Sequence, residues 1–177
     1  MIARPTRPVT RRLLRVAALA GALLGAGWLS GLKLMAFPGE SMAPAVGPGD
    51  HFVAFTRLWN LRSPRRFDLV IYDVPPGSKW AERKIPWMKR LIGLPEEHIR
   101  VSGSDLIVNG RKVDAPFLQP AAGRQEFEVT LGPNQFFMLG DNLDHSFDDS
   151  RSMGPIDRSL LRGRVAFVIR TSPTKNE

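Results

Sequence analysis

Cysteine is absent from the 177 residues of this sequence, and histidine occurs only three times. The absence of thiols excludes a disulfide-bonded scaffold, thiolate metal sites and a cysteine nucleophile. The histidines, His51, His98 and His145, are widely separated, and no two have the spacing of metal ligands on one helix or turn. We therefore expect no metal site and no cofactor, and we expect any catalytic nucleophile to be a serine, a threonine or a carboxylate.

Acidic residues are also missing at the N-terminus. Residues 1–15 contain five arginines and no acid, and residues 16–32 carry no charge. With Lys33 as its only charged residue, the segment 16–37 would span roughly 33 Å as a helix, which is enough to cross a bilayer. Because an arginine-rich flank stays on the cytoplasmic side, we expect 1–15 to be a cytoplasmic tail, 16–37 a single transmembrane anchor and the remainder to lie outside.

Two other interpretations of this segment remain open. A basic start and an Ala/Leu-rich run also occur in cleaved secretory signal peptides, and small residues at 25–27 could provide a cleavage site. The apolar run continues beyond them, which favours an uncleaved anchor. A buried amphipathic helix would need a polar face, whereas this run is apolar on every face.

The net charge of +8 is concentrated in the N-terminal segment. Residues 34–177 contain 19 basic and 17 acidic residues, so the rest of the chain is nearly balanced. Such a balance does not favour a nucleic-acid-binding function. The basic N-terminus instead indicates an orientation in a membrane.

Residues 38–172 contain frequent prolines and glycines, with short runs of β-forming residues between them. Apart from a single turn at 157–161, we expect no helix there. The pattern predicts an all-β domain, an antiparallel barrel or sandwich, followed by a polar tail at 173–177. The expected strands are 51–56, 67–74, 86–94, 98–103, 105–113 (with a hairpin turn at Asn109-Gly110), 126–131, 135–140 and 164–170.

Ser41 stands out among the serines because of its surroundings, PGESMAPAVGPGD at residues 38–50. Gly39 lets the backbone approach a substrate closely, and the prolines stiffen the loop. On these residues alone, the loop is compatible with a catalytic serine or with a purely structural one.

Lys89 lies in a predicted strand, PWMKRLIGL at residues 86–94. Alternation places Trp87 and Lys89 on one face and Met88 and Arg90 on the other, so one of the two cations faces an interior or a cleft. Burial lowers the pKa of a lysine and could make its neutral amine a general base. The alternative is a surface Lys-Arg pair without a catalytic role.

A third segment, GDNLDHSFDDSRSMG at residues 140–154, is rich in aspartate and serine. Its acids could suggest calcium, but the segment lacks the central glycine and final glutamate of an EF-hand loop. An internal pair between an aspartate and Arg151, with serine hydroxyls nearby, is the better physical explanation.

Taken together, these segments resemble the type I signal peptidase family, whose members are membrane-anchored Ser/Lys serine peptidases. The resemblance covers nearly the whole chain, in order: the anchor, GESMAPAVGPGD, RRFDLVIYDVP, KRLIGLPEEHIRVSGSDLIVNGRKV and FFMLGDNLDHSFDDSRSMGPI. It implies a location in the bacterial cytoplasmic membrane, with the catalytic domain on the outer face. The implied substrates are exported preproteins with small residues at the first and third positions before the cut.

The resemblance also implies roles for individual residues. Ser41 would be the nucleophile and Lys89 the general base of a reaction through an acyl-enzyme. Backbone at Ser41 and Gly39 would form the oxyanion hole, although some members have a serine hydroxyl where this chain has Gly39. Ser146 matches the serine that orients the lysine. The implied groove residues are Phe37, Pro38, Met42, Trp87 and Met88.

The segment 140–154 departs from the family pattern at two places. Leu143 stands where many members have arginine, and one extra residue follows Phe147. The insertion leaves two candidates, Asp148 and Asp149, for the partner of Arg151, and we favour Asp149.

Three other functions remain in competition with general signal-peptide removal. They are a dedicated processing peptidase of a conjugation or secretion system, a self-cleaving Ser/Lys regulator, and an anchored β-domain without activity. The anchor argues against the regulator.

The anchor also limits how far Ser41 can lie from the membrane. An extended chain would carry Ser41 at most about 14 Å beyond Phe37, so Ser41 is expected close to the outer membrane surface.

Overall fold

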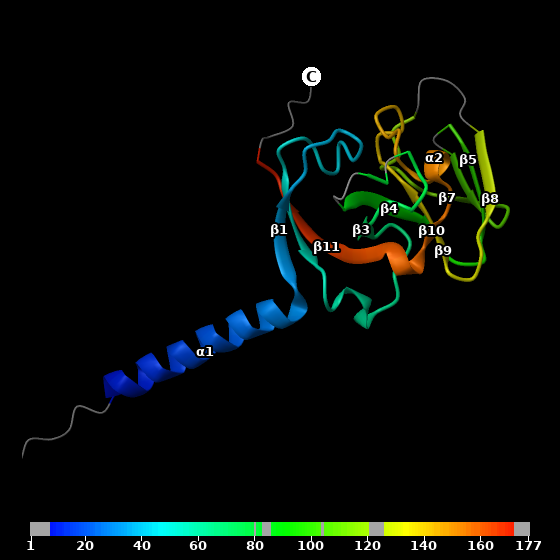
Figure 1. Ribbon diagram of the computed structural model, residues 1–177. Coiled ribbons are helices and arrows are strands. Elements are labelled where there is room, and N and C mark those ends of the chain that lie inside the picture. Colours follow the sequence, from blue (N-terminus) through cyan, green and yellow to red (C-terminus); the bar gives the residue numbers. More distant parts are fainter. Residues whose placement is uncertain (1–7, 80, 83–85, 104, 121–125, 172–177) are drawn as a thin grey trace, which may run out of the picture.

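The computed structural model describes residues 8–79, 81–82, 86–103, 105–120 and 126–171. A long N-terminal helix, α1, projects from a β domain that contains two antiparallel sheets (Figure 1). This architecture confirms the predicted all-β fold class behind an apolar helix. The polar tail expected at 173–177 lies outside the described residues.

Helix α1 (Pro8–Ser30) begins earlier and ends earlier than the sequence suggested. Its part from Arg12 to Ser30 is long and apolar enough to cross a membrane, judged by length and composition. The helix stops at Gly31, whose φ of 65° is the left-handed conformation that commonly ends helices. The expectation of one helix over residues 16–37 is therefore wrong beyond Ser30.

The apolar residues that follow Gly31 form strand β1 (Leu32–Ala36) instead. Strand β1 pairs antiparallel with β2 (His51–Phe55), so that Leu32 lies opposite Phe55. Gly31 packs so tightly here that a Cβ would lie 2.6 Å from Arg57 Cγ. The chain therefore passes from the helix directly into an edge strand of the β domain.

The larger sheet has seven strands in the order β1-β2-β11-β3-β4-β9-β10. Each neighbouring pair is antiparallel, and β4 lies near the centre between β3 and β9. The further strands of this sheet are β3 (Leu69–Tyr72), β4 (Trp87–Gly93), β9 (Gln135–Leu139), β10 (Ile156–Asp157) and β11 (Leu161–Ile169).

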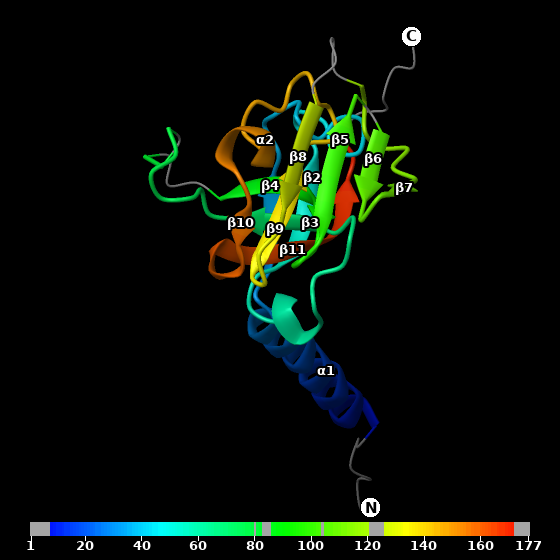
Figure 2. The same ribbon diagram turned by 90° about the vertical axis from the view of Figure 1, so that its right-hand side faces the viewer.

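The smaller sheet has four strands in the order β7-β6-β5-β8, and it lies in front of the larger one in Figure 2. Asn109 and Gly110 join β6 to β7 with φ angles of 49° and 76°, as expected for a tight hairpin turn. The strands of this sheet are β5 (His98–Ser102), β6 (Asp105–Val108), β7 (Arg111–Val113) and β8 (Glu126–Thr130).

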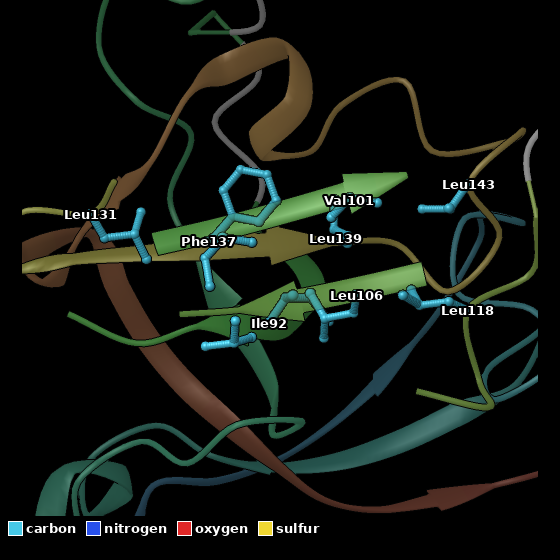
Figure 3. Close-up of a cluster of buried hydrophobic side chains, with 10 residues drawn as sticks. Ile92, Val101, Leu106, Leu118, Leu131, Phe137, Leu139 and Leu143 are labelled. Carbon is cyan, nitrogen blue, oxygen red and sulfur yellow. The ribbon is translucent and has the colours of Figure 1, made fainter. Parts of the chain in front are cut away.

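A hydrophobic core fills the space between the two sheets (Figure 3). Val101 and Leu106 from the smaller sheet pack with Ile92 and Phe137 from the larger one. Gly93 allows this close approach, because a Cβ there would lie 2.7 Å from Leu131 Cδ1. The core thereby packs β4 and β9 of the larger sheet against the smaller sheet.

Three short helical turns complete the described fold: η1 (Trp59–Leu61), α2 (Ser150–Met153) and η2 (Arg158–Leu160). The single turn expected at 157–161 corresponds to η2. Helix α2 was not expected. It follows β9 along the chain, and Ser150 Oγ accepts a hydrogen bond from the Met138 N–H at 2.9 Å.

Candidate active site

The loop between β1 and β2 holds Ser41, and the loop is closed by hydrogen bonds at its base. Phe37 N–H donates to the Asp50 carbonyl at 2.8 Å, and Gly49 N–H donates to the Phe37 carbonyl at 2.9 Å. Asp50 also accepts from Gly47 N–H, and this bond lowers the pKa of the Asp50 carboxyl. These bonds fix a compact loop in which Ser41 is only 9% exposed.

Lys89 reaches Ser41 from the central strand β4. Its side chain is 2% exposed, and Nζ lies 2.8 Å from Ser41 Oγ. The two residues are 48 positions apart in sequence, so the fold brings them together. A buried amine in hydrogen-bond contact with a serine hydroxyl has the geometry of a nucleophile and its base.

Asp148 lies on the other side of the lysine. Its Oδ1 accepts a hydrogen bond from Lys89 Nζ at 2.9 Å, and the aspartate side chain is 30% exposed. Lys89 Nζ is thus bonded both to a serine hydroxyl and to a partly exposed carboxylate.

The side chain of Asp149 points in a different direction from that of Asp148, and its carboxylate accepts several buried hydrogen bonds. Its carboxylate accepts from Ser146 Oγ at 2.7 Å and from Arg151 Nε at 2.9 Å. Asp149 is fully buried, and the oxygen that accepts from Ser146, Oδ2, also accepts from Gly140 N–H at 3.3 Å. The structure therefore pairs Arg151 with Asp149.

The start of the same segment, at Gly140, lies against the backbone of Ser41. Asn142 N–H donates to the Ser41 carbonyl at 3.1 Å. A Cβ at Gly140 would lie 2.5 Å from that same carbonyl oxygen, so only glycine fits without displacement. Gly140 therefore contacts both the Asp149 carboxylate and the loop that holds Ser41.

A second buried ion pair holds the segment against strand β4. Arg90 Nε donates to Asp141 Oδ1 at 2.7 Å, and the guanidinium also lies over the ring of Phe117. Burial raises the pKa of Asp141, while the pairing with Arg90 opposes this shift. Lys89 and Arg90 thus both bind the segment, one on each face of the strand.

Comparison with known proteins identifies the family of the chain. Residues 10–170 match the family model described as signal peptidase, peptidase S26. The chain belongs to this family. The match includes both the Ser41 loop and the segment that contains Asp149, and it confirms the family and enzyme class predicted from the motifs.

Individual relatives agree with this assignment. Signal peptidase I of Bacillus caldolyticus is 32% identical over 143 residues, covering 73% of this chain and 74% of the relative. Signal peptidase I of Bacillus licheniformis is 30% identical over 142 residues, covering 73% and 72%. The probable signal peptidase I-2 of Synechocystis is 31% identical over 131 residues, covering 74% of this chain but 59% of that protein.

A solved structure is also similar in sequence. The crystal structure of a signal peptidase I from Enterococcus faecalis V583 is 27% identical, with a TM-score of 0.48. The superposition covers 58% of this chain and 97% of that chain.

A groove of about 420 Å³ opens beside Ser41 and Lys89 in this peptidase-family chain. Four of the five predicted groove residues contribute to its walls: Phe37, Pro38, Trp87 and Met88. The segment Met35–Ala36 of β1 and Gly39 also line it. Phe37, expected at the end of the anchor, therefore lies in the groove wall, beyond the end of α1 at Ser30.

Met42 does not line the groove, contrary to expectation. It is fully buried and packs in a core cluster with Val46 and Phe52. Met42 therefore anchors the Ser41 loop in the hydrophobic core.

Ser146 also differs from the expected lysine-orienting residue. Its hydroxyl donates to Asp149, whereas the acceptors of Lys89 Nζ in the described part of the chain are Ser41 and Asp148. Asp148 thus occupies the position beside the lysine that the resemblance had assigned to Ser146.

Sequence reasoning missed two contacts of this site. The Lys89–Asp148 pair was not considered, because both aspartates were weighed only as partners of Arg151. The Arg90–Asp141 pair had a signal, since β-strand alternation directs neighbouring cations to opposite faces.

The histidines lie apart from the groove. His98 and His145 are exposed and lie near Glu128 and Glu40, respectively. Within the described ranges, no three His, Asp or Glu side chains gather as potential metal ligands.

Proposed function

We propose that this protein is a membrane-bound serine endopeptidase that removes signal peptides from exported preproteins. The observation that carries the proposal is the buried contact of 2.8 Å between Lys89 Nζ and Ser41 Oγ at the wall of a groove. Membership in the signal peptidase family supports the class of substrate.

In the proposed reaction, the neutral amine of Lys89 removes the proton of Ser41 as Oγ attacks the scissile carbonyl carbon. The tetrahedral intermediate then expels the new N-terminus of the mature protein, which takes the proton back from Lys89. Water then attacks the acyl carbon while Lys89 accepts its proton. The ester bond to Ser41 Oγ breaks as Lys89 returns that proton to Oγ, which releases the signal peptide and restores the enzyme. The backbone at Ser41 and Gly39 would stabilise the oxyanion.

The groove accounts for the expected preference for small side chains before the cut. Its walls are mainly apolar and include the rings of Phe37 and Trp87. We propose that an extended signal-peptide end lies in this groove, with small residues at its first and third positions. A larger side chain would have to displace these buried walls, which is costly in close-packed protein.

For the membrane, we propose a single span by α1, with its arginine-rich start in the cytoplasm and the β domain outside. The span ends by Ser30, so the 11 residues to Ser41 could extend at most about 40 Å. Pairing of β1 with β2 shortens that reach, and residues of β1 line the groove. The groove would therefore lie close to the outer membrane surface, where a signal peptide's cleavage site emerges.

The test is cleavage of a preprotein with an Ala-X-Ala cleavage site by the full chain in detergent micelles. Ser41→Ala and Lys89→Ala should each lower kcat/KM by about 1,000-fold or more. Lys89→Arg should be equally inactive, because arginine keeps the charge but does not accept a proton at these pH values.

Lys112→Ala is the matched control, because this exposed lysine pairs with Asp105 in the smaller sheet. It should cleave at the wild-type rate. Mass spectrometry of the products should locate the cut after the second alanine. Activity of Ser41→Ala or Lys89→Arg within tenfold of the wild type would contradict the proposed mechanism.

A further inference from the structure

The adjacent aspartates Asp148 and Asp149 bind two different cations. Asp149 turns inward and pairs with Arg151, with 1% of its side chain exposed. Asp148 turns to Lys89 and keeps 30% of its side chain exposed. The extra residue in this segment therefore places a carboxylate against the proposed catalytic base.

The other ionisable groups near Lys89 leave Asp148 as its specific counter-ion. Asp141 is held by Arg90, and Asp149 is held by Arg151. Tyr72 of β3, the strand next to β4, is neutral because burial raises the pKa of its hydroxyl well above the usual value. Among the carboxylates in the described part of this site, Asp148 is thus the one that forms an ion pair with Lys89.

This pairing conflicts with the proposed chemistry. A general base must be neutral, but Nζ lies 2.9 Å from the Asp148 carboxylate, and an ion pair at this distance requires the ammonium form. In that form Lys89 has no lone pair and can only donate to Ser41 Oγ. The arrangement in the structure is therefore a resting one, if Lys89 is the base of the proposed function.

We infer that Asp148 is a displaceable counter-ion, which keeps Lys89 protonated until a substrate fills the groove. The inference rests on the proposed function. Asp148 lines the groove together with Ser41 and Lys89, so a bound chain competes for the space of its carboxylate. Its partial exposure gives the carboxylate a route into water. Lys89 then releases its proton to water and becomes the neutral amine that accepts the Ser41 proton.

Asp148→Asn tests this positioning role. Asparagine keeps the size of the side chain and an oxygen that can accept from Lys89, but removes the charge. On the acidic side of the profile of kcat/KM against pH, we expect the variant to be faster than the wild type by about tenfold or more, in line with the effect of an adjacent opposite charge on protonation. At alkaline pH the two rates should converge.

Asp105→Asn is the matched control, because it removes the carboxylate of the other described Lys–Asp pair, with Lys112 at 2.7 Å in the smaller sheet. Its pH profile should superimpose on that of the wild type. A profile of Asp148→Asn that superimposes on the wild type, or that is lowered equally at every pH, would overturn the inference.

Two measurements separate this inference from the proposed function. If Ser41→Ala still cleaves, the proposed function fails; if Ser41→Ala is inactive but the Asp148→Asn profile is unshifted, only the counter-ion role fails. The ¹⁵Nζ chemical shift of Lys89 in the substrate-free wild type reports the charge without any variant. An ammonium shift at pH 7 is expected, and a neutral-amine shift there would overturn the inference.

Discussion

The buried pair between Asp149 and Arg151 offers a quantitative test of what holds the candidate site together. The exposed fractions of the two side chains are only 1% and 12%, and Arg151 Nε and Nη2 both donate to the carboxylate. Replacing Asp149 with alanine leaves a buried guanidinium without its carboxylate. Breaking a buried pair in this way costs about 3–5 kcal/mol.

The loss should be measured as a change in the free energy of unfolding. Urea unfolding can be followed by tryptophan fluorescence, to which Trp87, buried in β4, is one of four contributors. Asp149→Ala should lower the free energy of unfolding by about 3–5 kcal/mol. Asp73→Ala is the control, because Asp73 and Arg162 form an exposed pair, and such pairs contribute at most about 1 kcal/mol.

A double variant separates the unpaired charge from a general loss of packing. Asp149→Leu with Arg151→Met removes both charges, and apolar replacement of a whole buried pair is often close to neutral. The double variant should therefore be more stable than Asp149→Ala alone. A single variant within 1 kcal/mol of the wild type, or a double variant less stable than the single, would refute the reasoning.

Two further predictions concern the core and the membrane. Tyr72 is fully buried, and its hydroxyl has no hydrogen-bond partner among the described residues, so Tyr72→Phe should raise the free energy of unfolding by about 1 kcal/mol in the same urea assay; a loss of that size would indicate a partner for the hydroxyl. Because the chain has no cysteine, Thr6→Cys and Lys112→Cys each introduce a unique thiol. In intact cells, a membrane-impermeant maleimide should label Lys112→Cys and spare Thr6→Cys, whereas the reverse pattern would contradict the proposed orientation.

The β domain was largely predictable because its signals are local. Alternating side chains and turn residues, such as Asn109-Gly110, mark strands and hairpins without knowledge of their partners. The strand β1 was predicted as part of the helix, because the local signal there is ambiguous. Leu32–Ala36 continues an apolar run, and hydrophobicity alone does not distinguish a helix from a buried or edge strand, so the change at Gly31 was hidden.

The motifs predicted Ser41 and Lys89 as members of the candidate site, but not the contacts that surround them. Ser41 and Lys89 were recognised from their motifs, and the structure brings their side chains together. Asp148 and Asp149 have the same chemistry and are adjacent in sequence. Only the packing of the segment against β4 decides which of them turns to Lys89 and which to Arg151.

The edge strand β1 determines where the chain could be cut to make a soluble fragment. Deleting residues 1–37, as the length of the apolar run would suggest, would leave β2 as a bare sheet edge and remove Met35 and Ala36 from the groove wall. A fragment that begins at Leu32 keeps both. The hydrophobic segment therefore consists of two structural parts, a helix that projects from the β domain and a strand that belongs to its larger sheet.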